Sequence, residues 1–337
     1  MKPSSQPVIS LDLLPCILNQ IGSPPILSLP KTLKSFSVIL TERHPLQRNA
    51  VFIYSALVYI VILLDLVCLC SGPLGNTQII SEEYVKWLKS YCEAFFYGLT
   101  VKLLPPVPVS ATKCSFRVNE NTQNLQIHAG HILKFLKKKK PEDAFCVVGI
   151  TMIDLYPRDS WNFVFGQASL TDGVGIFSFA RYGSDFYSSR YKGQVKTLQE
   201  KSSHDYSVFD NYYIPEVTSV LLLRSCKTLT HEIGHTFGVR HCQWLACLMQ
   251  GSNHLEEADR RPLYLCPICL RKLQCAIGFN IRERYKALVR WIDEESSGTP
   301  GVTPKHSRED NVNLPKPVEA FKEWKEWIIK CLAVVQN

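Results

Sequence analysis

The sequence has no strong charge imbalance and no stripe of basic residues interleaved with aromatic ones. Its 337 residues include 38 Lys and Arg against 30 Asp and Glu, which gives a formal net charge of +8. The densest basic run is Lys137–Lys140. Because it follows an apolar pattern of helical period, we interpret it as the solvated C-terminal end of a helix. These features argue against nucleic-acid binding, so we expect no nucleic-acid partner.

No signal peptide is apparent at Met1, and the 13 cysteines lack the pattern of a disulfide-stabilised secreted domain. Their number is odd, the chain is long, and four of them have the spacing of metal ligands. The other nine are scattered along the chain: Cys16, Cys68, Cys70, Cys92, Cys114, Cys146, Cys226, Cys275 and Cys331. We therefore expect reduced thiols in a reducing compartment, the cytoplasm or the nucleus.

One long apolar run complicates that expectation. Residues 51–70 read VFIYSALVYIVILLDLVCLC, in which Asp65 is the single charge. The length of the run and the arginines before it make it a candidate membrane anchor. Its β-branched and aromatic centre is also typical of a buried strand in an α/β sheet, the reading that we favour. The sequence leaves both readings open.

From residue 75 onward, the periodicity predicts an α/β fold in which helices cover a sheet. Ser81, followed by Glu82 and Glu83, begins a helix that ends at Gly98. We expect further helices over residues 125–140, 214–237, 280–295 and 320–335. We expect strands over residues 99–104, 144–155, 161–166 and 174–182, with a turn at Asp172 and Gly173.

The motif HEIGHTFGVRH begins at His231 and predicts a zinc site. His231 and His235 lie one helical turn apart on the same face, and Gly238 lets the chain turn back so that His241 reaches the same ion. Three neutral imidazoles leave the fourth position of a tetrahedral zinc open for water, as in catalytic sites. Glu232 projects beside the metal, where it can take a proton from the zinc-bound water and return it to a leaving amine.

Four cysteines directly after this motif predict a second zinc ion. Cys242 and Cys247 form one short-spaced pair, and Cys266 and Cys269 form another. A Cys₄ set has no open position and acts as a structural site. Seven ligands exceed what one tetrahedral zinc accepts, so we expect two Zn²⁺ ions per chain. Because His241 and Cys242 are neighbours, we infer that the structural zinc holds the third histidine in place.

These residues together resemble the archaemetzincin family of zinc metalloproteases, in particular its animal members. The similarity rests on HEIGHTFGVRHCQWLACLM and CPIC, and it extends from about Gly75 to the C-terminus. It implies a metzincin-like zincin fold: a mixed twisted sheet with long helices, including the zinc-binding helix, and a small zinc-stapled lower subdomain. It also implies that Met249 lies beneath the catalytic metal as the Met-turn residue. An extended substrate would add to the sheet along residues 162–168.

The resemblance suggests four parts of the chain. Residues 1–72 are an atypical N-terminal region that departs from the family. Within this region, residues 58–64 would supply the first strand of the sheet. Residues 73–297 form the metzincin-like catalytic domain, with the Cys₄ module at 242–269. Residues 298–319 form a flexible linker, and residues 320–337 a C-terminal amphipathic helix that docks onto the body.

Our leading hypothesis is a monomeric zinc metallopeptidase that acts on peptide or protein substrates, with aminopeptidase-like cleavage of short peptides suggested by the resemblance. Two alternatives remain. In the first, the chain is a zinc-stabilised interaction module with weak or vestigial peptidase activity. In the second, it is a peptidase tethered to a membrane through residues 51–70.

Overall fold

The computed structural model describes residues 57–63, 75–169, 171–183, 185–188, 205–209, 212, 216–294 and 316–335, with residues 57–63 and 75–82 described by their backbone alone. The expected N-terminal region up to residue 56 and most of the expected linker at 298–319 therefore lie outside the described residues. So does part of the polar stretch between residues 183 and 216.

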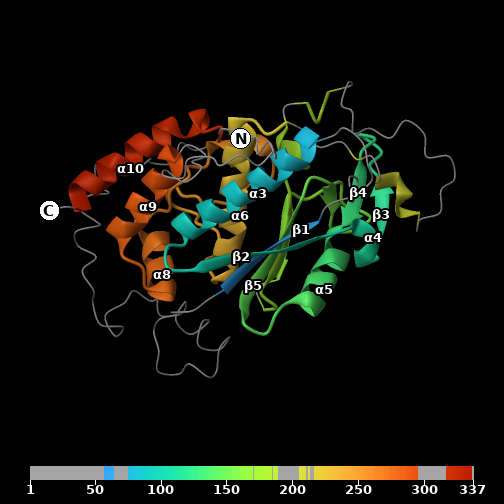
Figure 1. The fold of residues 1–337 in the computed structure, drawn as a ribbon, viewed down its shortest axis with the longest axis horizontal. Coiled ribbons are helices and arrows are strands. Elements are labelled where there is room, and N and C mark those ends of the chain that lie inside the picture. Colours follow the sequence, from blue (N-terminus) through green and yellow to red (C-terminus); the bar gives the residue numbers. More distant parts are fainter. Residues whose placement is uncertain are drawn as a thin grey trace, which may run out of the picture.

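A five-stranded mixed sheet forms the centre of the molecule, with strand order β2-β1-β5-β8-β7 (Figure 1). Strands β1 (Leu57–Leu63), β2 (Thr100–Val107), β5 (Ala144–Thr151) and β8 (Val174–Ser178) are parallel, and the edge strand β7 (Gly166–Ser169) runs antiparallel to β8. This confirms the predicted fold class. Two prolines occur in β2, which is compatible with its position at the other edge.

The apolar run at residues 51–70 contributes a strand. Its central residues form β1, which pairs in parallel with both β2 and β5. Among the described residues no helix is long and apolar enough to cross a bilayer. The strand covers residues 57–63, one residue away from the expected 58–64. The remainder of the run lies outside the described residues.

A second, three-stranded sheet has the order β3-β4-β6, formed by β3 (Phe116–Val118), β4 (Leu125–His128) and β6 (Asp154–Tyr156). It corrects two predictions. The helix expected over 125–140 begins only at Ala129, because the preceding four residues pair with β3 and β6. The apolar run at 144–155 is split between the two sheets, since β5 ends at Thr151.

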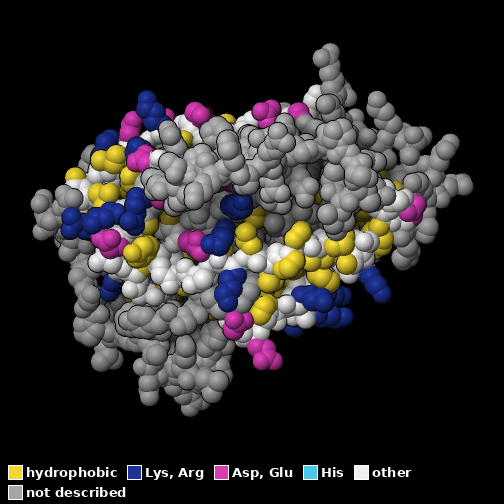
Figure 2. All heavy atoms as spheres, viewed as in Figure 1, with side chains coloured by type: hydrophobic (Ala, Val, Ile, Leu, Met, Phe, Trp, Pro, Cys, Tyr) yellow, Lys and Arg dark blue, Asp and Glu magenta, His cyan; other side chains and the backbone are white. Residues whose placement is uncertain are grey.

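Helices cover both faces of the large sheet, as Figure 1 shows. On one face lies α5 (Ala129–Lys139), and the short α4 (Val109–Thr112) precedes it in the chain. The basic residues at the end of α5 are exposed, as predicted, and Figure 2 shows Lys and Arg side chains gathered over this part of the surface. The other face carries α3 (Gly75–Phe95) and α6 (Ser219–Thr236). Farther from the sheet lie α7 (Leu255–Arg260), α8 (Pro267–Ile277), α9 (Ile281–Asp293) and α10 (Lys322–Val335).

The starts of two of these helices differ from the prediction by five or six residues. The first begins at Gly75 rather than Ser81, because no proline or turn dipeptide interrupts the residues before the expected cap. The zinc-motif helix α6 begins at Ser219 rather than at residue 214, because the Thr218 side chain caps it by accepting a hydrogen bond from the Leu221 amide at 3.2 Å. Helix α9 begins after Asn280 as predicted.

Side chains alternate between two cores across the large sheet. Val148 and Phe177 face the larger core with α3 and α6, while Val147 and Ile176 face the smaller core with α5. Burial on both faces explains why β5 reads as an unbroken apolar run. The larger core continues into α10, where Trp324, Ile328 and Cys331 are buried together with Phe321 just before the helix, as expected for a helix that docks onto the body of the protein.

Candidate metal centre

The structure brings the three histidines of the HEIGHTFGVRH motif together at the C-terminal end of α6. His231 and His235 project from the last two turns of the helix. Gly238 follows with a φ of 80°, a left-handed conformation that favours glycine, and so the chain leaves the helix there. The Nε2 atom of His231 lies 3.1 Å from that of His235 and 3.3 Å from that of His241.

This donor set fits a zinc ion. Nitrogen ligands of a tetrahedral zinc lie about 3.4 Å apart, close to the separations found here. The opposite ring nitrogens are oriented by backbone carbonyls: His231 Nδ1 lies 2.8 Å from Leu248 O, and His235 Nδ1 lies 2.6 Å from Val239 O. Such contacts leave Nε2 free for a metal. Burial lowers the pKa of His235 to about 4 and that of His231 well below its ordinary value, so both rings are neutral at pH 7.

Glu232 directly follows His231 on α6 and is half-buried. Burial raises the pKa of its carboxyl group to about 7, while the charge of Arg261 acts in the opposite direction. A carboxyl group with a pKa near neutrality can both accept and donate a proton at physiological pH. Its position directly after His231 on α6 is the one that the sequence predicts for a group that serves a bound water.

The four cysteines form a second compact cluster. Their sulfur atoms lie within 4.8 Å of one another, and those of Cys242 and Cys266 are 3.8 Å apart. Tetrahedral thiolates at a zinc–sulfur distance of about 2.3 Å are separated by a similar length. Backbone amides donate to the sulfurs, from Met249 and Cys266 to Cys247 Sγ at 3.4 and 3.2 Å. All four cysteines are unbridged, so the cluster is a thiol set suited to a metal.

The two clusters are connected through one short segment. The Cys242 amide donates to Met249 O at 2.8 Å, directly after His241, and the Leu248 amide donates to Tyr264 O at 2.7 Å. Met249 in turn packs against Gly234 of α6, where a Cβ atom would lie only 2.8 Å from the Met249 sulfur. A side chain at position 234 would therefore displace the Met249 side chain.

Two residues of this region were missed by the sequence analysis. Gly251 packs against the His241 ring, and a Cβ there would lie 3.0 Å from Nδ1. Arg261 is 6% exposed, and its Nη1 donates to Gln250 O at 2.9 Å and lies 3.0 Å from His231 Nδ1. Neither residue belongs to a motif, and their roles depend on contacts across 10 and 30 residues of sequence. No local signal could have identified them.

Gly251→Ala provides a test of the support that this glycine gives to His241. The added methyl group crowds the imidazole, so we expect the affinity for one of two zinc ions to fall about tenfold, in the range seen when outer contacts of metal ligands are lost. Competition with a chelating zinc indicator measures both affinities. Ser252→Ala, which adds no atoms, is the control. Unchanged affinities in Gly251→Ala would contradict this role.

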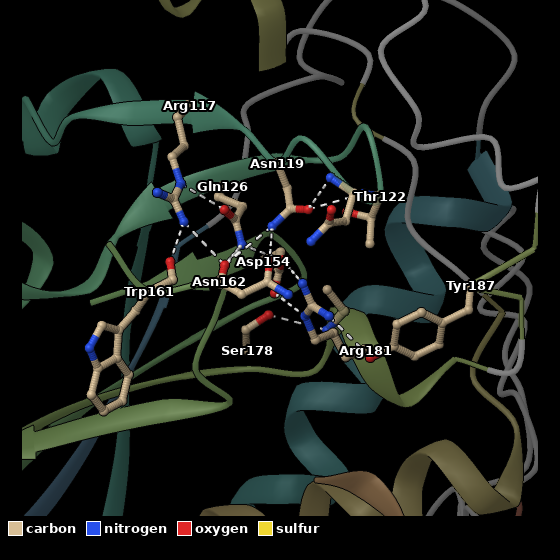
Figure 3. Close-up of polar contacts among 12 residues, drawn as sticks. Arg117, Asn119, Thr122, Gln126, Asp154, Trp161, Asn162, Ser178, Arg181 and Tyr187 are labelled. Atoms are coloured by element: carbon tan, nitrogen blue, oxygen red, sulfur yellow. Dashed lines mark hydrogen bonds and ion pairs between the residues drawn. The ribbon is translucent and has the colours of Figure 1, made fainter. Parts of the chain in front are cut away.

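The segment before the edge strand β7 is fixed by a polar network rather than by strand pairing (Figure 3). Arg117 donates to the carbonyls of Asp159 and Trp161, and Gln126 and Asn119 donate to the carbonyl of Asn162. These carbonyls are therefore satisfied by side chains. For that reason the strand predicted over 161–166 is replaced by an isolated bridge at Val164, and β7 begins at Gly166.

A buried ion pair lies at the centre of this network. Arg181 donates to both carboxylate oxygens of Asp154, at 2.8 and 2.7 Å, and its guanidinium stacks on the Phe163 ring with 3.6 Å between the guanidinium carbon and the ring centroid. The adjacent Tyr182 contacts Thr228 of α6 through its hydroxyl group at 2.5 Å. The network thus links the approach to β7 with the helix that carries the histidines.

Comparison with known proteins identifies the family. The model of peptidase family M54 matches residues 165–275. Archaemetzincin-2 of Homo sapiens is 86% identical over 266 residues, which cover 79% of this chain and 74% of that protein. Archaemetzincin-1 of Homo sapiens is 36% identical over 283 residues, covering 81% and 53% respectively. Among solved structures, archaemetzincin from Methanopyrus kandleri is similar with a TM-score of 0.43 and 23% identity, covering 68% of this chain and 97% of that chain.

By class, the protein is a zinc metallopeptidase. The chain belongs to the archaemetzincins, peptidase family M54.

Proposed function

We propose that His231, His235 and His241 hold a catalytic zinc ion and that Glu232 is the general base of peptide-bond hydrolysis. The observation that carries this proposal is the approach of the three Nε2 atoms, at 3.1 and 3.3 Å, at the end of the helix on which the half-buried Glu232 directly follows His231. We further propose that Cys242, Cys247, Cys266 and Cys269 hold a second, structural zinc, and that Met249 supports the histidines from below.

In this proposal the protein residues divide the chemistry among them. Zinc, when bound, supplies a Lewis acid that polarises the scissile carbonyl and acidifies water. Glu232 accepts the proton of the attacking water and then donates it to the leaving amine. The carbonyls of Leu248 and Val239 keep two imidazoles oriented. The segment that carries Cys242 and Met249 holds the third imidazole, that of His241.

We propose that an extended peptide pairs with the edge strand β7, whose outer side is not occupied by another strand among the described residues. Pairing of this kind uses main-chain hydrogen bonds and is tolerant of side-chain identity. The edge strand spans Gly166–Ser169. We therefore place the pairing of the peptide along these residues, rather than along the range 162–168 expected from the sequence.

The finer proposal is aminopeptidase-like action on short peptides. We expect peptides with a free amino terminus to lose single residues. Their N-acetylated counterparts should be cleaved at least about tenfold more slowly, because acetylation removes the charge of the amino terminus and one hydrogen bond to a charged group is worth roughly that factor. Mass spectrometry of matched peptide pairs measures both rates. Equal cleavage of free and blocked peptides at internal bonds would assign the protein to the endopeptidases instead.

A second candidate function is protein binding through the Cys₄ module. It is favoured by Trp244, whose side chain is 80% exposed on the turn between the first two cysteines. Large exposed aromatic residues are enriched at interfaces. A broad peptide-library screen of zinc-loaded protein separates the candidates, because absence of turnover with both zinc ions bound would favour the binding role.

A further inference from the structure

A cavity on the outer side of α6 has no part in the proposed reaction. Its volume is about 910 Å³, within the range of small-molecule sites, and it lies between α6, the segment from Asp259 to Tyr264 and the C-terminal helix α10. Its walls combine apolar and charged side chains. Leu223 contributes from α6, and the Tyr264 and Trp327 rings stack with centroids 4.4 Å apart and planes 13° from parallel.

A buried ammonium group lines this cavity. Lys227 is 7% exposed, and its Nζ donates to the backbone carbonyl of Asp259 at 2.9 Å. Among the described residues no carboxylate lies within ion-pair distance of it. The nearby Asp259 carboxylate is already engaged, because Arg224 donates to both of its oxygens at 2.9 and 2.8 Å. Buried charges are normally paired in direct contact. Lys227 has no such contact, and the Asp259 carboxylate attracts it only from farther away.

We propose that this cavity binds a small molecule with a carboxylate group and an apolar body, and that the carboxylate pairs with Lys227. The apolar body would lie against Leu223 and the stacked Tyr264 and Trp327 rings. Burial lowers the pKa of Lys227 to about 8, while the Asp259 carboxylate acts in the opposite direction. The charged residues Arg260, Glu323, Glu326 and Lys330 lie in exposed positions on the lining and carry charges of both signs that cancel.

The cavity lies close to the histidine cluster. Lys227 lies one helical turn before His231 on α6. Arg261, which also lines the cavity, has its Nη1 atom 3.0 Å from His231 Nδ1. A ligand in the cavity would therefore lie against the back of the zinc helix, and no residue of β7, along which we propose that the peptide binds, lines the cavity.

Calorimetric titration with decanoate and with decan-1-ol, which differ only in the head group, tests this inference on the zinc-loaded chain. We expect decanoate to bind at least about tenfold more tightly than the alcohol. Lys227→Met should abolish that difference, whereas Lys322→Met, on an exposed part of α10 outside the cavity, should preserve it. Equal binding of the two probes would overturn the proposal. So would a preference unaffected by Lys227→Met, since the carboxylate would then bind elsewhere, for example on zinc.

A second variant guards against misfolding of Lys227→Met. In Leu223→Glu, the new carboxylate lies four residues before Lys227 on α6, the favourable order for a helical ion pair. It should occupy the place of the ligand, so we expect loss of decanoate binding together with a raised melting temperature. Retained binding would contradict the site. A competition experiment in Glu232→Gln protein identifies the source of the carboxylate. Displacement of decanoate by a hydrophobic peptide with a free carboxyl end, but not by the amide of that peptide, would identify peptide termini. Displacement by neither peptide would identify free acids.

Discussion

Replacing Glu232 with Gln is expected to lower kcat/KM for peptide hydrolysis by about 100-fold or more, the usual contribution of a general base. The amide has nearly the shape of the carboxylate but cannot accept a proton from water. The three imidazoles are oriented by other groups, namely the Leu248 and Val239 carbonyls and the segment ending at Met249, so zinc content and thermal stability should be retained. Initial rates on a cleaved peptide, with metal analysis on the same samples, measure both effects.

The matched control is Glu142→Gln, because Glu142 is an exposed carboxylate far in sequence from the motif. It should leave the rate within a factor of about two of the parent. Hydrolysis by Glu232→Gln at the parental rate would remove the general base from the account. Loss of zinc from that variant would instead show that the carboxylate has a role in holding the metal.

Replacing Cys266 with Ser should have the largest effect on stability. Serine preserves the N-cap of α8, which the Cys266 sulfur now supplies by accepting from the Cys269 amide at 3.4 Å. It removes one thiolate from the cluster, so the structural zinc is lost. Structural zinc contributes about 10 kcal/mol or more to folding in small zinc modules, and we expect a loss of several kcal/mol here. Zinc stoichiometry and chemical denaturation measure the two consequences.

Cys275→Ser is the control for that variant, because Cys275 lies on the same helix, is only half-buried and does not belong to the cluster. It should keep the parental zinc content and stability. Since Cys242 follows His241 directly, loss of the structural ion should also weaken zinc binding at the histidines. Full stability and two bound zinc ions in Cys266→Ser would show that the four sulfurs do not form a metal site.

The two candidate metal clusters were predictable because the members of each are close in sequence. An α-helix places His231 and His235 on one face whatever the surrounding fold, and Gly238 permits the turn that returns His241. The spacing of the cysteines carries similar information. The central strand β5 was also evident, since a strand buried on both faces reads as an apolar run.

The remaining features depend on contacts between distant segments. Residues 125–128 carry the same apolar pattern as the helix that follows, and only pairing with β3 and β6 makes them a strand. Arg117 holds carbonyls more than 40 residues away, which determines where β7 begins. Arg261 and Gly251 contact individual histidines across the fold. No periodicity or local motif records such contacts.

Anomalous diffraction at the zinc absorption edge, on crystals of the zinc-loaded chain, tests the central claim most directly. We expect two anomalous peaks, one among the Nε2 atoms of His231, His235 and His241 and one among the four cysteine sulfurs. A single peak, or a disulfide bond within the cysteine cluster, would contradict the division into a catalytic and a structural site.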